Sequence, residues 1–243
     1  MPYTASREPI SERSRTRLYR VTELVGRWSM VDVFVVALMA ALVVDYSGDA
    51  DIFTALGMYM ITVIIGLFLL ILGLYPLMMR MLAGTRITTF LKGILPAQLV
   101  AVTTSSSAAT LPVTLKQVTS ELGVSKTIAN FVLPVGVTIN MDGTSCYQAI
   151  AAVFIAQVFG IDLTLGQQLT IVLTATLASI GSPGIPSGSI VMLIIVLNSV
   201  GLSVEGLALI LGVDRPLDML RSSVNLTGDS TISCIVAQSE NEM

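Results

Sequence analysis

The stretch that decides the fold is Asp218-Met219-Leu220-Arg221-Ser222-Ser223-Val224-Asn225-Leu226-Thr227-Gly228-Asp229. It lies inside Leu207–Val236, one of several long apolar segments. Asp218, Arg221, Asn225 and Asp229 are spaced by three, four and four residues, so in a helix they share one face. A charge at bilayer depth costs at least about 3 kcal/mol on the insertion scale. The stripe therefore indicates either a functional site or a tightly paired network.

The composition shows that these apolar segments belong to a membrane protein. Of the 243 residues, 53% are hydrophobic and 12% are charged, the net charge is -3 and the mean hydropathy is +0.83. Ordinary soluble chains carry about 25% charged residues. These values exclude a disordered chain, a disulfide scaffold and a nucleic-acid partner. The absence of histidine excludes every mechanism in which a histidine acts as the base or as a metal ligand. The class predicted is an all-α integral membrane protein in contact with membrane lipid.

The charges before residue 93 predict the orientation of the first two spans. Residues 1–27 are polar and rich in arginine, which predicts a cytoplasmic arm rather than a signal peptide. Residues 28–51 hold a short apolar run and then an acidic loop. Ile52–Met79 is long enough to cross a bilayer, and basic residues follow it between Arg80 and Lys92. The positive-inside rule therefore predicts a cytoplasmic N-terminus and a multi-pass topology.

Four later apolar segments are interrupted near the middle by small, polar or helix-breaking residues. They are 95–118, 128–159, 170–197 and 207–236. Irregular backbone at membrane depth is tolerated only where it is buried in protein or lines a polar cavity. Four such interruptions predict a shared polar centre. The first and third have Ser/Pro/Gly tips between apolar arms, the pattern of a re-entrant helical hairpin.

Two polar clusters suggest ligands for that centre. Arg221 offers a guanidinium fork to a carboxylate, and Asp218, one turn away, could receive an amino group. The competing interpretation is a salt bridge between these two residues that only holds the helices together. Asn225 and Asp229 are hard oxygen ligands suited to a small cation.

The second cluster is the break Asn140-Met141-Asp142-Gly143-Thr144. Its side-chain oxygens, with the carbonyls freed by an unwound turn, suit Na⁺ or another hard cation. The competing interpretation is a kink in which Asn140 and Asp142 cap the broken ends. The polar stripe on the last segment, which includes Arg221 and Asp229, makes the cation site the favoured interpretation over the kink.

These motifs resemble the dicarboxylate/amino acid:cation symporter family, the glutamate and aspartate transporters. The resemblance rests on Ser105-Ser106-Ser107-Ala108-Ala109-Thr110-Leu111-Pro112, the Asn140–Thr144 motif and the Asp218–Asp229 stretch, and runs from about residue 52 to the C-terminus. It implies a transport domain over 52–243, with two re-entrant hairpins and two broken helices. In it a helix over 52–79 precedes a hairpin over 95–118, a broken helix over 128–159, a hairpin over 170–197 and a last helix over 207–236.

The resemblance also assigns the site residues. The substrate would meet Ser105, Ser107, Thr144, Ile185, Asp218, Arg221, Ser222 and Asn225. One cation site would use Gly136, Asn140, Asn225 and Asp229, a second Thr138, Ser179, Ile180 and Ser182, and a third Asn140 and Asp142. Having both Asp218 and Arg221 favours an acidic amino acid over a neutral amino acid or a C4-dicarboxylate. The coupling ion would be Na⁺ or H⁺, with no organic cofactor.

The chain departs from the family before residue 52. The scaffold helices of full-length members are missing, so a homo-oligomer, a trimer, is expected only where a scaffold is supplied. The stretch Glu23–Leu38 instead resembles the paraquat-inducible protein A family, which implies a bacterial inner membrane and a truncated or fused transporter. The competing function is a non-transporting membrane protein acting through protein contacts. An intramembrane enzyme with Ser107 as nucleophile is disfavoured because no histidine is present and Lys116 is about two turns away.

Overall fold

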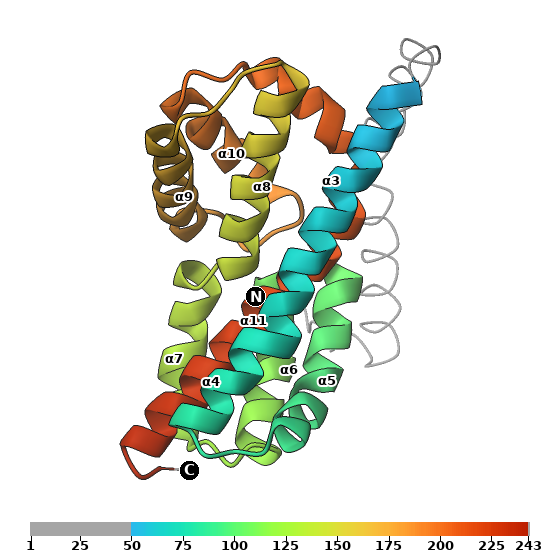
Figure 1. Cartoon of the computed structure of the whole chain (residues 1–243). Helices are drawn as coiled ribbons and strands as arrows, with labels where there is room; N and C mark the ends of the chain where they lie inside the picture. The colour runs from blue at the N-terminus through green and yellow to red at the C-terminus, as the bar shows by residue number, and fades with distance from the viewer. Residues whose placement is uncertain (1–49, 243) are drawn as a thin grey trace, which may run out of the picture. The chain divides into compact units, whose positions relative to one another are not determined.

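A computed structural model of the protein describes residues 50–242. The expectations placed on residues 1–49, which concern the arm, the short apolar run and its origin, lie outside the described residues. Within 50–242 every regular element is a helix (Figure 1). The order is α3 Ala50–Phe68, η1 Leu69–Leu74, α4 Tyr75–Leu82, α5 Ile87–Thr104, α6 Ser107–Ser120, α7 Lys126–Ile139, α8 Asp142–Val158, α9 Leu165–Ile180, α10 Gly188–Ser199, η2 Val204–Gly206 and α11 Leu207–Ser239.

The first helical rod joins α3, η1 and α4, and it contains a π-helical turn. The most apolar 18 residues of Ile52–Leu82 have a mean hydropathy of 2.6, and the 18 residues of α5 have a mean of 1.3, so both stretches are long and apolar enough to cross a membrane. In η1 the Tyr75 N–H bonds to the Leu70 carbonyl, five residues back. The wider turn precedes Pro76, which cannot donate to a residue four positions earlier. The π-turn therefore lets the helix continue through a proline.

The helix pairs α5–α6 and α9–α10 lie side by side and turn sharply at serine-rich tips (Figure 1). Ser105 in the first tip and Ser187 in the second have left-handed backbones, with φ of 51° and 56°. At the first tip the Ser106 hydroxyl accepts the Ala109 N–H at 3.2 Å and so caps α6. Both tips therefore point small polar groups into the interior.

The four expected interruptions are not equivalent in the structure. Three occur: the two tips, and a break at Asn140–Met141 between α7 and α8. The fourth segment is different, because α11 runs without a break for 33 residues. The hydroxyls of Thr227, Ser230, Thr231 and Ser233 each donate to the carbonyl four residues earlier, so the polar side chains are satisfied within the helix. The expectation of a second broken helix therefore fails at α11.

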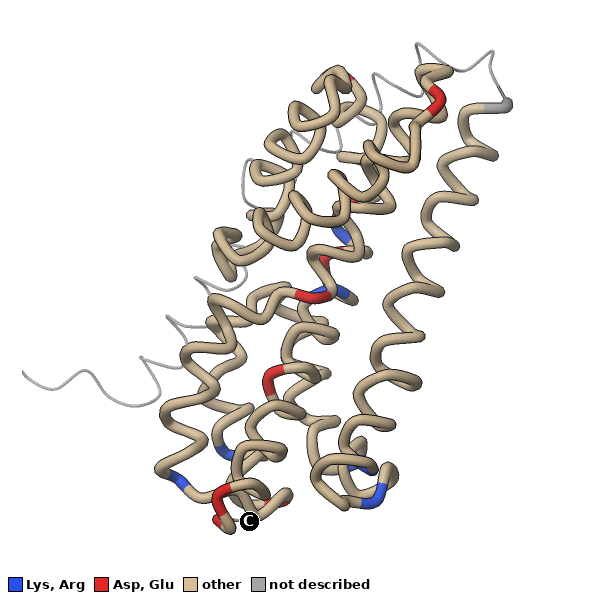
Figure 2. Tube along the Cα trace, turned by 60° about the vertical axis from the view of Figure 1, so that its left-hand side comes forward, with Lys and Arg blue, Asp and Glu red and all other residues tan. Residues whose placement is uncertain are grey.

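Helix α11 is the centre of the packing. It contacts α3, α4, α5, α6, α7 and α8, and most of its middle is buried. Figure 2 shows a trace almost free of charge, apart from the ends of helices and a cluster midway along the molecule. The buried ion pairs of Arg221 with Asp214 and Asp218 belong to α11, and these charges are enclosed by the other helices.

Candidate substrate and cation site

Arg221 is the buried cation at the centre of the site. Its side chain is 1% exposed, and Nη2 donates to Asp214 Oδ1 at 2.9 Å and to Asp218 Oδ1 at 2.8 Å. Nε and Nη1 have no hydrogen-bond partner among residues 50–242. The Tyr147 ring lies beneath the guanidinium, 3.7 Å from Cζ to the ring centroid. The arginine thus keeps donors free for a further acceptor.

A small polar cavity surrounds this arginine. All the residues that the sequence assigns to the substrate line it, together with Met141, Ser182, Pro183, Gly184 and Ser189. They come from both tips, from the break between α7 and α8, and from α11. The volume is about 20 Å³, which is room for about one water molecule. The walls must therefore separate before a larger ligand can enter.

Hydrogen bonds hold the second tip across the cavity. Ser106 Oγ donates to the Gly184 carbonyl at 2.7 Å, which joins the two tips. The Ser187 N–H donates to Asp218 Oδ2 at 2.8 Å, and the Ser187 hydroxyl donates to Asp214 Oδ2 at 3.1 Å. The same carboxylates that pair with Arg221 therefore also anchor the second tip.

The first set of cation residues converges where the helix break meets α11. Asn140 Nδ2 donates to Asp229 Oδ1 at 2.9 Å and to the Asn225 carbonyl at 3.4 Å. A Cβ on Gly136 would lie 2.5 Å from Asp229 Oδ1, so only glycine allows this approach. One buried carboxylate among carbonyl and amide oxygens is a donor set that suits a hard monovalent cation.

The other cation residues are arranged less tightly. Helix α7, which carries Thr138, packs against α9, which carries Ser179 and Ile180 at the edge of the second tip; Ser182 lies within that tip. Asp142 is exposed and accepts the Tyr75 hydroxyl at 2.8 Å. Among residues 50–242 no group of three or more carboxylates or thiols lies close enough to hold a metal. A cation here would therefore be held mainly by carbonyl and amide oxygens.

The structure adds three residues that the sequence did not assign to the site. Asp214 lies four residues before Asp218 on the same face of the helix, so the spacing alone could have predicted that it belongs to the site. Tyr147 follows the Asn140–Thr144 motif, but nothing in its spacing indicates a contact with Arg221. Tyr75 reaches Asp142 across 67 residues, and no sequence pattern predicts that bond.

Comparison with known proteins identifies the family to which this fold and site belong. Residues 12–239 match the model described as "Sodium:dicarboxylate symporter family". Excitatory amino acid transporter 4 of Rattus norvegicus is 46% identical over 204 residues, 84% of this chain and 36% of that protein. Excitatory amino acid transporter 1 of Mus musculus is 47% identical over 199 residues, which are 82% of this chain and 37% of that protein. Excitatory amino acid transporter 5 of Homo sapiens is 44% identical over 203 residues, which are 84% of this chain and 36% of that protein.

The chain is therefore a multi-pass membrane protein of the transporter class. It belongs to the sodium:dicarboxylate symporter family. This confirms the family expected from the motifs and the all-α membrane fold, and the family is one of symporters rather than of enzymes. The comparisons do not support the second resemblance, because the family match begins at residue 12 and runs through Glu23–Leu38. The chain spans little more than a third of the length of these relatives.

Proposed function

We propose that this chain binds an acidic amino acid, aspartate or glutamate, together with sodium ions, and acts as the transport domain of a sodium-coupled symporter. The observation that carries the proposal is Arg221, a fully buried guanidinium whose Nε and Nη1 find no partner among residues 50–242, in a cavity lined by both tips. A buried charge with unused donors indicates an anionic ligand.

The neighbouring groups match the remaining parts of such a ligand. An acidic amino acid carries two carboxylates and one ammonium. Arg221 would hold one carboxylate, and Asp218 would accept the ammonium. The second carboxylate would meet the first tip, where the buried Ser105 hydroxyl has no hydrogen-bond partner among the described residues. Thr144 and Asn225, whose side chains lie 3.3 Å apart, complete the polar wall.

Entry of this ligand requires the second tip to move. The ligand ammonium would compete with the Ser187 N–H for Asp218, and the tip would be freed as that bond is lost. A bound sodium ion would supply positive charge that compensates the buried Asp229 carboxylate. Asn140, which donates to Asp229, would carry that change to the helix break beside the substrate residues.

The remaining assignments extend the proposal to the whole protein. Residues 52–243 would form the transport domain, and a trimer would require scaffold helices supplied from elsewhere. The N-terminus and the loop between α4 and α5 would face the cytoplasm of a bacterium, with the chain in its inner membrane. Sodium is favoured over protons as the coupling ion because of the family to which the chain belongs.

The test is binding of radiolabelled aspartate to the purified chain in sodium, in choline, and in choline at acidic pH. We expect saturable binding that requires sodium and that weakens at least about 30-fold in Arg221→Ala, since truncating a buried charge partner costs about 2 kcal/mol or more. Arg215→Ala is the matched control, because Arg215 lies on the same helix and does not line the cavity. An absence of binding in every cation would refute the proposal.

Binding alone does not separate a symporter from a membrane protein that retains the site without transporting. Uptake of aspartate into proteoliposomes driven by an inward sodium gradient makes that distinction. Binding with uptake supports the full proposal. Binding without uptake limits it to the substrate site and favours the non-transporting alternative.

A further inference from the structure

Ser189 lines the cavity around Arg221 but is not among the residues assigned to the substrate. It lies in the first turn of α10 and is 5% exposed. Its hydroxyl has no hydrogen-bond partner among residues 50–242. A buried hydroxyl without a partner costs free energy unless a ligand or a water molecule supplies one. The Ser189 hydroxyl therefore indicates a polar group that binds within the cavity.

The backbone around Ser189 is held firmly. Gln148, which is fully buried on α8, donates from Nε2 to the Ser189 carbonyl at 3.0 Å. Gly188 packs so closely on the second tip that a Cβ there would lie 2.8 Å from the Pro183 carbonyl oxygen. The hydroxyl thus projects from a fixed point and can adjust only by rotation of its own side chain.

The same part of α8 also positions Arg221. Tyr147 precedes Gln148 in the sequence, and its ring lies 3.7 Å from the Arg221 guanidinium carbon. Two consecutive residues of α8 therefore hold Ser189 and Arg221 on the same side of the cavity. Arg221 Nε and Nη1, like the Ser189 hydroxyl, have no partner within the described residues. Unpaired donors from two helices thus meet at one wall.

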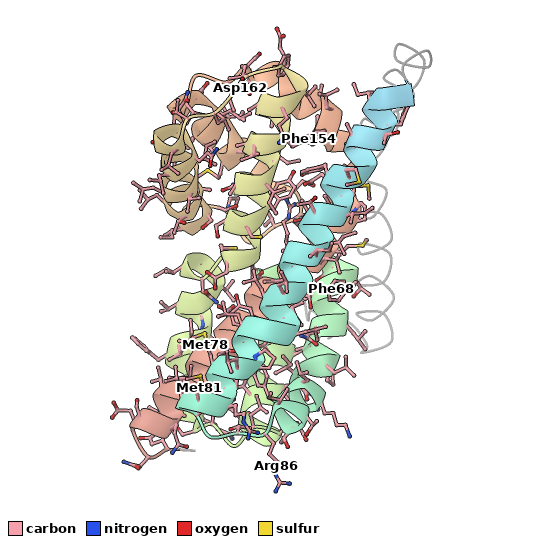
Figure 3. The ribbon with its side chains drawn as sticks, in the orientation of Figure 1. Phe68, Met78, Met81, Arg86, Phe154 and Asp162 are labelled. Atoms are coloured by element: carbon pink, nitrogen blue, oxygen red, sulfur yellow. The ribbon has the colours of Figure 1, made fainter. Side chains whose placement is uncertain are left out.

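The charges near this wall favour an anion as the missing partner. Within the part of the chain that the structure describes, Arg221 is the only cation in the cavity lining. The charged side chains of Arg86 and Asp162 lie at opposite ends of the helical bundle (Figure 3). A sodium ion beside Arg221 would be repelled, and the N-terminus of the 12-residue helix α10 adds partial positive charge. A carboxylate is therefore the group that suits Ser189.

The size of the cavity limits the length of the acid that carries this carboxylate. The volume is about 20 Å³, so the walls must separate to admit any amino acid. If Asp218 holds the ammonium and the first tip holds one carboxylate, the length of the side chain decides where the other carboxylate lies. Aspartate has one methylene fewer than glutamate and needs the smaller separation of the walls.

We propose that the Ser189 hydroxyl donates to the substrate carboxylate held by Arg221, and that this bond makes the site selective for aspartate over glutamate. The inference rests on the proposed function and narrows its substrate to the four-carbon acid. The flat guanidinium of Arg221 offers two free donors and can hold a carboxylate at more than one position. A hydroxyl fixed through Gln148 serves only one position, so side-chain length becomes part of recognition.

Competition binding in saturating sodium tests the selectivity. Radiolabelled aspartate is displaced by unlabelled aspartate or glutamate from the wild type and from Ser189→Ala. We expect the wild type to favour aspartate by roughly tenfold or more, the usual effect of one methylene in a close-fitting site. Ser189→Ala should weaken aspartate by roughly tenfold, as expected for loss of a hydrogen bond to a charged group, and glutamate by less than about twofold.

The matched control is Ser230→Ala. Ser230 is also a buried serine, but its hydroxyl donates to the Leu226 carbonyl at 2.9 Å and it does not line the cavity. Its replacement should leave the preference for aspartate unchanged. Thermal unfolding without ligand gives a second readout. Ser189→Ala should unfold at the same temperature as the wild type or higher, because the lost hydroxyl had no partner. A clear fall would show that Ser189 is structural and would overturn the inference.

The binding results also distinguish this inference from the proposed function. Unchanged aspartate affinity in Ser189→Ala would show that the hydroxyl meets only water, and equal weakening of both acids would show that it acts on closure of the tip. Either result, or a wild type that binds both acids equally, overturns the selectivity and leaves the proposed function intact. A wild type that binds neither acid overturns both.

Discussion

The guanidinium carbon of Arg221 lies 3.7 Å from the centre of the Tyr147 ring, so α11 and α8 meet through a cation and an aromatic face. Tyr147 is fully buried, and its hydroxyl has no hydrogen-bond partner in the described part of the chain. A desolvated contact of this kind contributes about 2 kcal/mol. The ring face, rather than the hydroxyl, therefore holds the arginine in place.

Exchanging Tyr147 separates these two roles. Tyr147→Phe keeps the face and should change aspartate affinity by less than about twofold, whereas Tyr147→Leu removes the face and should weaken it about tenfold or more. Titration with aspartate in saturating sodium measures both, and thermal unfolding checks that each variant is folded. Equal weakening by both substitutions would show that the hydroxyl is the important group.

Removing Asp214 should unbalance the buried charges around Arg221. Asp214→Ala leaves the guanidinium with Asp218 alone and should lower stability without ligand by about 3 kcal/mol. Aspartate should raise the unfolding temperature more in this variant than in the wild type, because a ligand carboxylate replaces the missing charge. Asp162→Ala, in an exposed loop, should change stability by less than about 0.5 kcal/mol. A smaller ligand effect in Asp214→Ala would contradict this role.

The close approach of Gly136 to Asp229 predicts an effect on sodium. In Gly136→Ala the new methyl would lie 2.5 Å from Asp229 Oδ1, and relieving this overlap costs roughly 1–3 kcal/mol. We expect the sodium concentration for half-maximal aspartate binding to rise roughly tenfold. Gly57→Ala is the control, because nothing lies within 4 Å of its added carbon. An unchanged sodium requirement with reduced stability would make Gly136 a packing residue only.

The shorter of the two bonds between the tips, from the Ser106 hydroxyl to the Gly184 carbonyl, predicts a kinetic effect; the other runs from the Ala108 N–H to the same carbonyl at 3.5 Å. Ser106→Ala removes both the 2.7 Å bond to the Gly184 carbonyl and the cap on Ala109, each worth about 1 kcal/mol. Aspartate should leave roughly five to ten times faster, as measured by chase with unlabelled aspartate. Ser120→Ala removes only local bonds, to the Lys116 carbonyl and to the Glu121 carboxylate, and should leave the rate unchanged. Equal rates in the two variants would show that the tips separate without breaking the Ser106 bond.

Periodicity predicted only part of the group around Arg221, because Asp214 and Tyr147, which contact the guanidinium, were not assigned to the site. The spacing of Asp218, Arg221 and Asn225 placed them on one face, and the structure brings them to one cavity with the serines of the first tip. The prediction for α11 was wrong about its backbone, because hydroxyls that bond back to their own helix satisfy the same residues that elsewhere mark a break.

Contacts between distant segments could not be predicted. Tyr75, which follows the π-turn, donates to Asp142 across 67 residues, and no spacing pattern in the sequence points from one residue to the other. Gln98 donates to Thr227 across 129 residues, and neither side chain has a spacing pattern that points to the other. Such partners are fixed by the packing of α11 among its neighbours.

The central position of α11 has a consequence for biosynthesis. Gln98, Asn140 and the Gly143 N–H all find partners on this helix, the last in the described sequence. Asn140 and its partner Asn225 are 85 residues apart, an interval on the order of ten seconds at ordinary rates of translation. During that time, polar groups of earlier segments lack their native partners in the membrane. Nascent chains stalled before Leu207 should therefore stay at the insertion machinery and be cleared by membrane proteases rather than fold.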